Sequence, residues 1–145
     1  MLYGHECALV LTTERYLIMN FELQKALHYI DLQETEKAIS CLKTAIQQEL
    51  DSGNEAAATE CRCVLGELYA LDQQKDESRE QFEKVMEYSV RTGELMKQRE
   101  IAVMYLAAFD GKLPAPGRRP GDAPLVAKPV QNKGFISKQM NKRHR

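Results

Sequence analysis

The chain has 145 residues, of which 43% are hydrophobic and 28% are charged, and its formal net charge is −1. This composition is that of an ordinary soluble domain and excludes the fibrous and membrane classes. The apolar run from Cys7 to Leu11 is too short to span a bilayer, and it lacks the preceding Lys or Arg and the cleavage site of a signal peptide. We therefore expect a cytoplasmic or nuclear protein without a transmembrane segment.

The charges divide the chain at residue 111. Residues 1–111 carry 11 Lys and Arg against 20 Asp and Glu, whereas residues 112–145 carry 9 basic residues against the single Asp122. The sequence thus predicts an acidic body with a basic tail. Such an asymmetry suggests that the tail takes part in an interaction.

The first predicted elements are an N-terminal segment and two helices. Residues 1–13 form the segment, in which the apolar residues are too closely spaced to define a face. Thr12 or Thr13 is the candidate N-cap of a helix that ends at about Asp31. After a turn, a second helix runs from Thr35, because apolar residues recur there at spacings of three and four, and Gly53 ends it.

Three further helices complete the predicted body. One starts near Asn54, the next follows a turn from Asp72 to Lys75 and ends at Gly93, and the last covers about residues 94–109. The last helix has no partner, because Asp110-Gly111 is followed by five prolines. Residues 112–145 hold too few large apolar side chains to offset the entropy of ordering, so we predict a Pro-containing, basic, disordered tail.

The predicted helices repeat every forty residues. A shift of forty residues places Tyr29 on Tyr69, Leu42 on Phe82 and Gly53 on Gly93, as read from the sequence. A fixed period of this length indicates a solenoid, in which each unit buries its apolar face against a neighbour.

Within this repeat, Leu65, Gly66 and Tyr69 of one helix and Phe82 of the next resemble the tetratricopeptide repeat (TPR). The long period with glycines between units is similar to the repeats of Pins-type and kinesin light chain scaffolds. The resemblance implies an all-α fold over residues 14–111, a short α-solenoid of antiparallel helix pairs in a right-handed stack. An unrelated helical bundle is the alternative.

The resemblance also implies a concave groove lined by the first helix of each unit. The predicted groove residues are Asn20, Leu23, Leu27, Ile30, Glu60, Cys63, Glu67, Ala70, Glu100, Val103 and Ala107. The three glutamates would repel a terminal carboxylate, which chaperone-binding members of the family hold, and would favour a basic, partly apolar peptide or helix. Alternatively, these glutamates are solvated surface charges.

The expected function is that of a noncatalytic scaffold or adaptor that binds another protein. Residues 128–145 place Phe135, Ile136 and Met140 between lysines, so the tail itself is an expected intramolecular ligand of the groove. Two and a half repeats is close to the minimum for a stable stack, so self-association would be unsurprising. Another alternative is that the chain is a fragment of a larger TPR protein.

The basic tail allows a different function. Its cations could contact nucleic acid or an acidic membrane, with the helical part as a spacer, or could simply aid solubility. The basic residues in question are Lys133, Lys138, Lys142, Arg143 and Arg145.

The sequence contains no recognisable catalytic or metal-binding motif. Its three histidines are scattered, and none lies in a nucleophile motif. Cys61 and Cys63 are separated by roughly 200° about a helix axis, so they cannot share a metal there. We predict reduced thiols, no enzymatic activity, no cofactor and no metal site.

Overall fold

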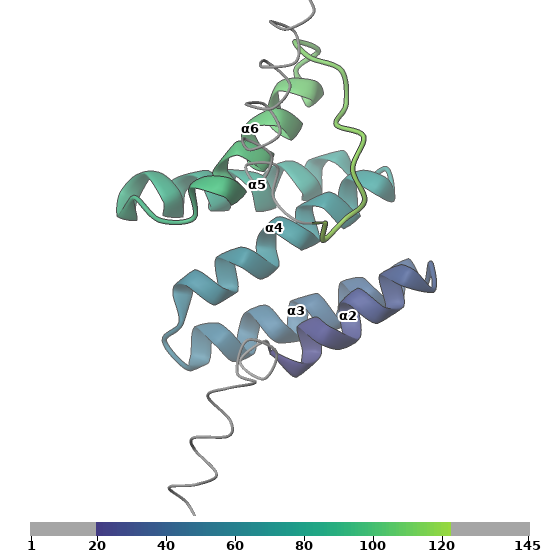
Figure 1. Ribbon diagram of the computed structural model, residues 1–145, viewed down its shortest axis with the longest axis vertical. Coiled ribbons are helices and arrows are strands. Elements are labelled where there is room, and N and C mark those ends of the chain that lie inside the picture. Colours follow the sequence, from purple (N-terminus) through teal and green to yellow (C-terminus); the bar gives the residue numbers. More distant parts are fainter. Residues whose placement is uncertain (1–19, 123–145) are drawn as a thin grey trace, which may run out of the picture.

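The computed structural model describes residues 20–122, and within them the chain is all-α (Figure 1). Its five helices, in chain order, are α2 (Phe21–Asp31), α3 (Thr35–Asp51), α4 (Glu55–Leu71), α5 (Lys75–Thr92) and α6 (Met96–Phe109). No strand occurs in this range, and none of these helices is long and apolar enough to cross a membrane. The predicted all-α fold class is confirmed.

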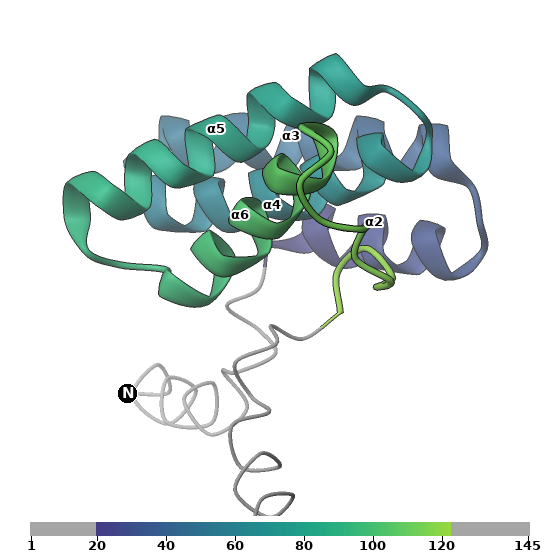
Figure 2. The same ribbon diagram turned by 90° about the horizontal axis from the view of Figure 1, so that it is seen from above.

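Consecutive helices pack against one another, α2 on α3, α3 on α4, α4 on α5 and α5 on α6. Figure 1 shows this succession along the long axis, with α2 and α3 at one end and α6 at the other. Figure 2 shows two layers, with α3 and α5 in one and α2, α4 and α6 in the other. The arrangement is compatible with a helical repeat in which every second helix lies on the same face.

The core runs through the contacts between the helix pairs. Leu42 from α3 and Leu65 from α4 belong to one buried cluster, and Phe82 from α5 and Tyr105 from α6 belong to the next. The Phe82 and Tyr105 rings stack with centroids 4.7 Å apart. Gly66 makes room for this stack, because a Cβ there would lie 2.9 Å from Phe82 Cζ.

The turns after α2 and α4 have the same geometry, forty residues apart. The N–H of Glu34 donates to Tyr29 O at 2.8 Å, and the N–H of Gln74 donates to Tyr69 O at 2.8 Å. Each pattern is a Schellman motif, which requires a left-handed residue just past the helix. That residue is Gln33 (φ 61°) in the first turn and Gln73 (φ 65°) in the second.

Gln73→Gly is expected to raise the free energy of unfolding by about 1 kcal/mol, because glycine adopts a left-handed φ without the steric cost of a Cβ. Gln74→Gly is the matched control, since φ is −98° at Gln74 and glycine there only adds freedom to the unfolded chain. Urea unfolding followed by circular dichroism measures both. A gain in both variants, or in neither, would show that the left-handed φ is not the cause.

Two predicted helix starts differ from the structure. Helix α2 begins at Phe21, because the Asn20 side chain accepts hydrogen bonds from the N–H groups of Glu22 (2.7 Å) and Leu23 (3.3 Å). Thr12 and Thr13 therefore do not cap this helix. Helix α6 begins at Met96, since Leu95 has a left-handed φ of 57°. The other predicted boundaries lie within about one residue of those in the structure, where α4 begins at Glu55 and α5 at Lys75. Gly53 and Gly93 both have φ 78°.

The predicted boundary of the tail at residue 112 also differs from the structure. Residues 112–122 leave the end of α6 and return toward α4 (Figure 1), and Pro120 is buried. Polar contacts of Arg118 and Gly121 with Glu67 hold this segment in place. A segment with few apolar side chains can be ordered by such contacts. The predicted segment 1–13 and residues 123–145 lie outside the described residues.

Candidate binding groove

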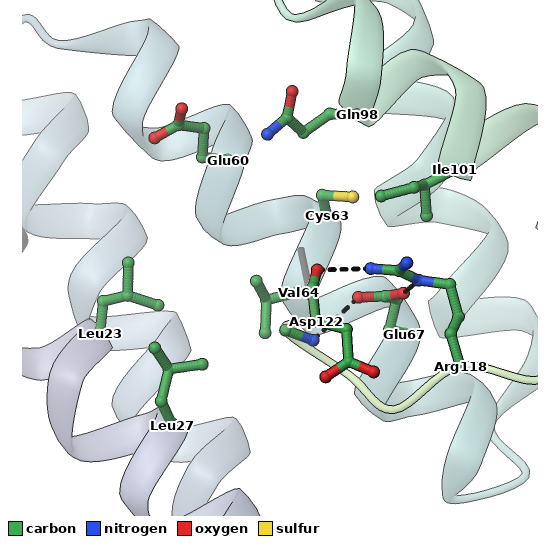
Figure 3. A pocket seen from close by; sticks show the side chains of 11 residues that line it. Leu23, Leu27, Glu60, Cys63, Val64, Glu67, Gln98, Ile101, Arg118 and Asp122 are labelled. Atoms are coloured by element: carbon green, nitrogen blue, oxygen red, sulfur yellow. Dashed lines mark hydrogen bonds and ion pairs between the residues drawn. The ribbon is translucent and has the colours of Figure 1, made fainter. Parts of the chain in front are cut away.

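A groove of about 200 Å³ lies between α2, α4 and α6 (Figure 3). Its floor is α4, whose residues at positions 60, 63, 64 and 67 share one face because of the helical period. We use "the groove" for the surface formed by Leu23, Leu27, Glu60, Cys63, Val64, Glu67, Gln98 and Ile101. It therefore combines four aliphatic side chains with two carboxylates.

Glu67 is a carboxylate inside the fold, with 2% of the residue exposed. Arg118 Nε donates a hydrogen bond to its Oε2, and the N–H of Gly121 donates to its Oε1 at 3.0 Å (Figure 3). A buried charge is tolerated when it is paired and hydrogen-bonded. Both oxygens of Glu67 are thus satisfied by one short segment of the same chain.

Residues 119–122 form a β-turn, and together with Arg118 they make up the segment that we call the docked turn. The N–H of Asp122 donates to Arg119 O at 3.1 Å, with Pro120 and Gly121 at the two central positions. Gly121 has φ 85°, the value that a type II turn demands at its third residue. Arg118 Nη2 closes the segment by donating to Asp122 O at 2.6 Å.

The groove carries negative charge in a partly desolvated setting. Burial raises the pKa of the Glu67 carboxyl, while the hydrogen bonds from Arg118 and Gly121 act against this rise. Burial also raises the pKa of Glu60, and the nearby charge of Glu49 adds to the effect. Burial alone would lower the pKa of Arg118, but its hydrogen bond and charge interaction with Glu67 together raise it. Arg118 supplies a cation to Glu67, whereas no ion pair is formed by Glu60 among the described residues.

The cysteines near the groove are buried thiols. Burial raises the pKa of Cys61 to about 12 and also raises the pKa of Cys63, which is 3% exposed and lies in the groove. Thiols in this state are protonated and poor nucleophiles. Among residues 20–122, no group of three or more His, Cys, Asp or Glu side chains is placed to hold a metal ion.

The structure brings five of the predicted groove residues together: Leu23, Leu27, Glu60, Cys63 and Glu67.

Three other predicted groove residues lie elsewhere. Ala70 lines an adjoining depression beside Tyr105. Ile30 is buried at 8% exposure and lines a separate cavity that also contains Arg119. Asn20 caps α2, and its amide donates to Gln48 and Glu49.

The groove positions predicted on α6 do not line the groove defined above. Glu100 and Val103 line a different surface pocket with Met96, Arg99 and Met104, and Ala107 contributes its carbonyl to the N–H of Lys112. The groove instead receives Gln98 and Ile101. Each residue turns the face by about 100°, so the side of α6 that faces α4 is out of phase with the side that the repeat assigns to the groove.

The sequence reasoning missed Arg118 and Gly121. The signal for the turn was present, because Pro-Gly favours a type II turn, and two arginines precede it in a chain with an acidic body. The predicted intramolecular ligand, residues 128–145, lies further along the chain. That segment and the basic residues from Lys133 to Arg145 are outside the described part of the structure.

No family model, no curated protein and no solved structure matches this chain.

Proposed function

We propose that this protein is a noncatalytic adaptor, a TPR-like stack whose groove binds a basic, partly apolar segment of another protein. The observation that supports it best is the pairing of Glu67 with Arg118, because an arginine-bearing segment without regular secondary structure already fits the groove. Complementary charge favours such a partner and rejects an acidic one.

The groove also contains residues that could contact a ligand beside the docked turn. Glu60 has no ion pair among the described residues, and Leu23 and Val64 lie along the same groove. A segment with a cation and an aliphatic side chain two residues apart would place charge near Glu60 and apolar surface against these residues. In an extended peptide, side chains two residues apart lie on the same face, so both would reach the groove.

The proposal predicts that the full chain selectively binds a short labelled peptide in which Arg and Leu take turns at every second position, with Ser between them. A peptide of Glu and Leu with the same length is the control ligand. Fluorescence anisotropy should detect the basic peptide only, and the affinity should fall as salt is added. Glu60→Lys should weaken binding at least about tenfold, whereas Glu80→Lys on the exposed outer face of α5 should not.

Equal binding of the two peptides, or equal effects of the two Glu→Lys variants, would contradict the proposal. A variant that ends at Asp122 tests the basic tail separately, because it keeps the docked turn and lacks residues 123–145. If this truncation alone removes peptide binding, the tail carries the interaction and the groove does not.

A further inference from the structure

The two carboxylate oxygens of Glu67 accept hydrogen bonds from two different groups of the docked turn. Oε2 accepts from the guanidinium of Arg118, and Oε1 accepts from the backbone N–H of Gly121. The two donors are three residues apart in sequence, and only the folded turn brings them to one carboxylate. A ligand whose arginine donated only to Oε2, as Arg118 does, would without the turn leave Oε1 buried without a donor, which costs about 1–3 kcal/mol.

The groove also selects the residue at the third turn position. A Cβ at position 121 would lie 2.8 Å from Leu27 Cδ2, and φ at this position is 85°, where side chains other than glycine are strained. Pro120 is buried beside it and holds the φ that the preceding turn position needs. The local sequence that fits is therefore arginine, one free position, proline and glycine.

Arg119 occupies the position of this local sequence that the groove does not constrain, and its contacts differ from those of Arg118. The Arg118 side chain is 7% exposed, whereas the Arg119 side chain is 63% exposed. Arg119 pairs at 3.4 Å with Asp31, whose side chain is also largely exposed. Exposed ion pairs contribute little, so recognition depends on the first arginine of the pair.

The connection between α6 and the docked turn is largely exposed. Residues 112–115 and Gly117 are exposed and belong to no helix. The buried pair of Arg118 and Glu67 has a desolvation cost that offsets much of its Coulomb attraction. An equivalent ligand from another chain would make the same contacts. It can replace the docked turn when its concentration exceeds the effective concentration that the covalent link gives to residues 118–122.

We propose that the groove is a recognition site for an Arg-x-Pro-Gly turn, and that a partner protein presenting this turn binds by displacing residues 118–122. This inference rests on the proposed function and specifies the ligand of the same groove.

The test uses the full chain and a labelled peptide with the sequence of residues 114–122. Arg118→Gln weakens the binding of the chain's own docked turn. This variant should therefore bind the labelled peptide at least about tenfold more tightly than the unaltered chain. Arg119→Gln is the matched control, because it makes the same change one residue away and should not increase affinity. Arg118→Gln combined with Glu67→Gln should lose the gain, and so should peptides with Gln at position 118 or Ala at position 121.

The thiol of Cys63 reports whether the docked turn leaves the groove. Alkylation by iodoacetamide, located by mass spectrometry, should be faster at Cys63 in Arg118→Gln and Gly121→Ala than in Arg119→Gln. Cys61, which is 1% exposed in the core of the stack, should stay protected in all variants and so shows that each remains folded.

Equal peptide affinity for Arg118→Gln and Arg119→Gln would overturn the inference. If the Arg and Leu peptide still binds the groove in that case, the adaptor function stands and only the turn specificity fails. If neither peptide binds although Cys63 becomes reactive in Arg118→Gln, the docked turn has left the groove but the groove has no affinity for basic ligands. Both proposals then fail.

Discussion

Phe82→Ala is expected to lower the free energy of unfolding by about 3–5 kcal/mol, the usual range for a buried phenylalanine. The Phe82 side chain is fully buried and lies between Gly66 on α4 and Tyr105 on α6. Its removal would leave a cavity at the junction of three helices, and glycine at position 66 has no side chain to fill it. Small domains have a total stability of about 5–15 kcal/mol, so the loss is severe.

Phe21→Ala is the matched control for this prediction. Phe21 is 67% exposed, and its removal should change the stability by no more than about 0.5 kcal/mol. Urea unfolding followed by circular dichroism at 222 nm suits both variants, because the chain has no tryptophan. Similar losses in the two variants would mean that the Phe82 ring is not the centre of the α4–α5–α6 packing.

Gly66→Val is expected to destabilise the fold by about 2–3 kcal/mol, in the range found for overpacked cores. Three atoms of the Phe82 ring lie 2.9–3.0 Å from the position of an added Cβ. The ring cannot move away freely, because it stacks on Tyr105. The steric cost should therefore exceed the helix propensity that is gained when glycine is replaced.

The steric cause can be isolated by a double-mutant cycle. In a Phe82→Leu background the penalty of Gly66→Val should fall by at least about 1 kcal/mol, because residues in contact couple by this amount. Phe82→Leu keeps enough apolar volume for the variant to fold. Gly53→Ala serves as the control, since nothing lies within 4 Å of a Cβ there and its cost comes from φ 78° alone. That cost should be the same in both backgrounds, and an unchanged Gly66→Val penalty would rule out the contact with Phe82.

The helices and turns of this protein follow from its sequence because their determinants are local. Apolar spacing predicts the α3 and α5 faces that carry Leu42 and Phe82, and glycines mark where the chain takes a left-handed conformation at Gly53 and Gly93. The same periodicity places Glu60, Cys63 and Glu67 on one face of α4, and all three line the groove. These features need only a few neighbouring residues.

The occupant of the groove and the orientation of α6 were decided by the tertiary structure. Arg118 and Glu67 are 51 residues apart in sequence, and no local pattern states that they meet. Similarly, α6 presents Gln98 and Ile101 to the groove because of how it packs on α4 and α5, and not because of its place in the repeat. Local patterns determine dihedral angles and helix faces, whereas the pairing of distant surfaces depends on helix packing and on the path by which the chain returns.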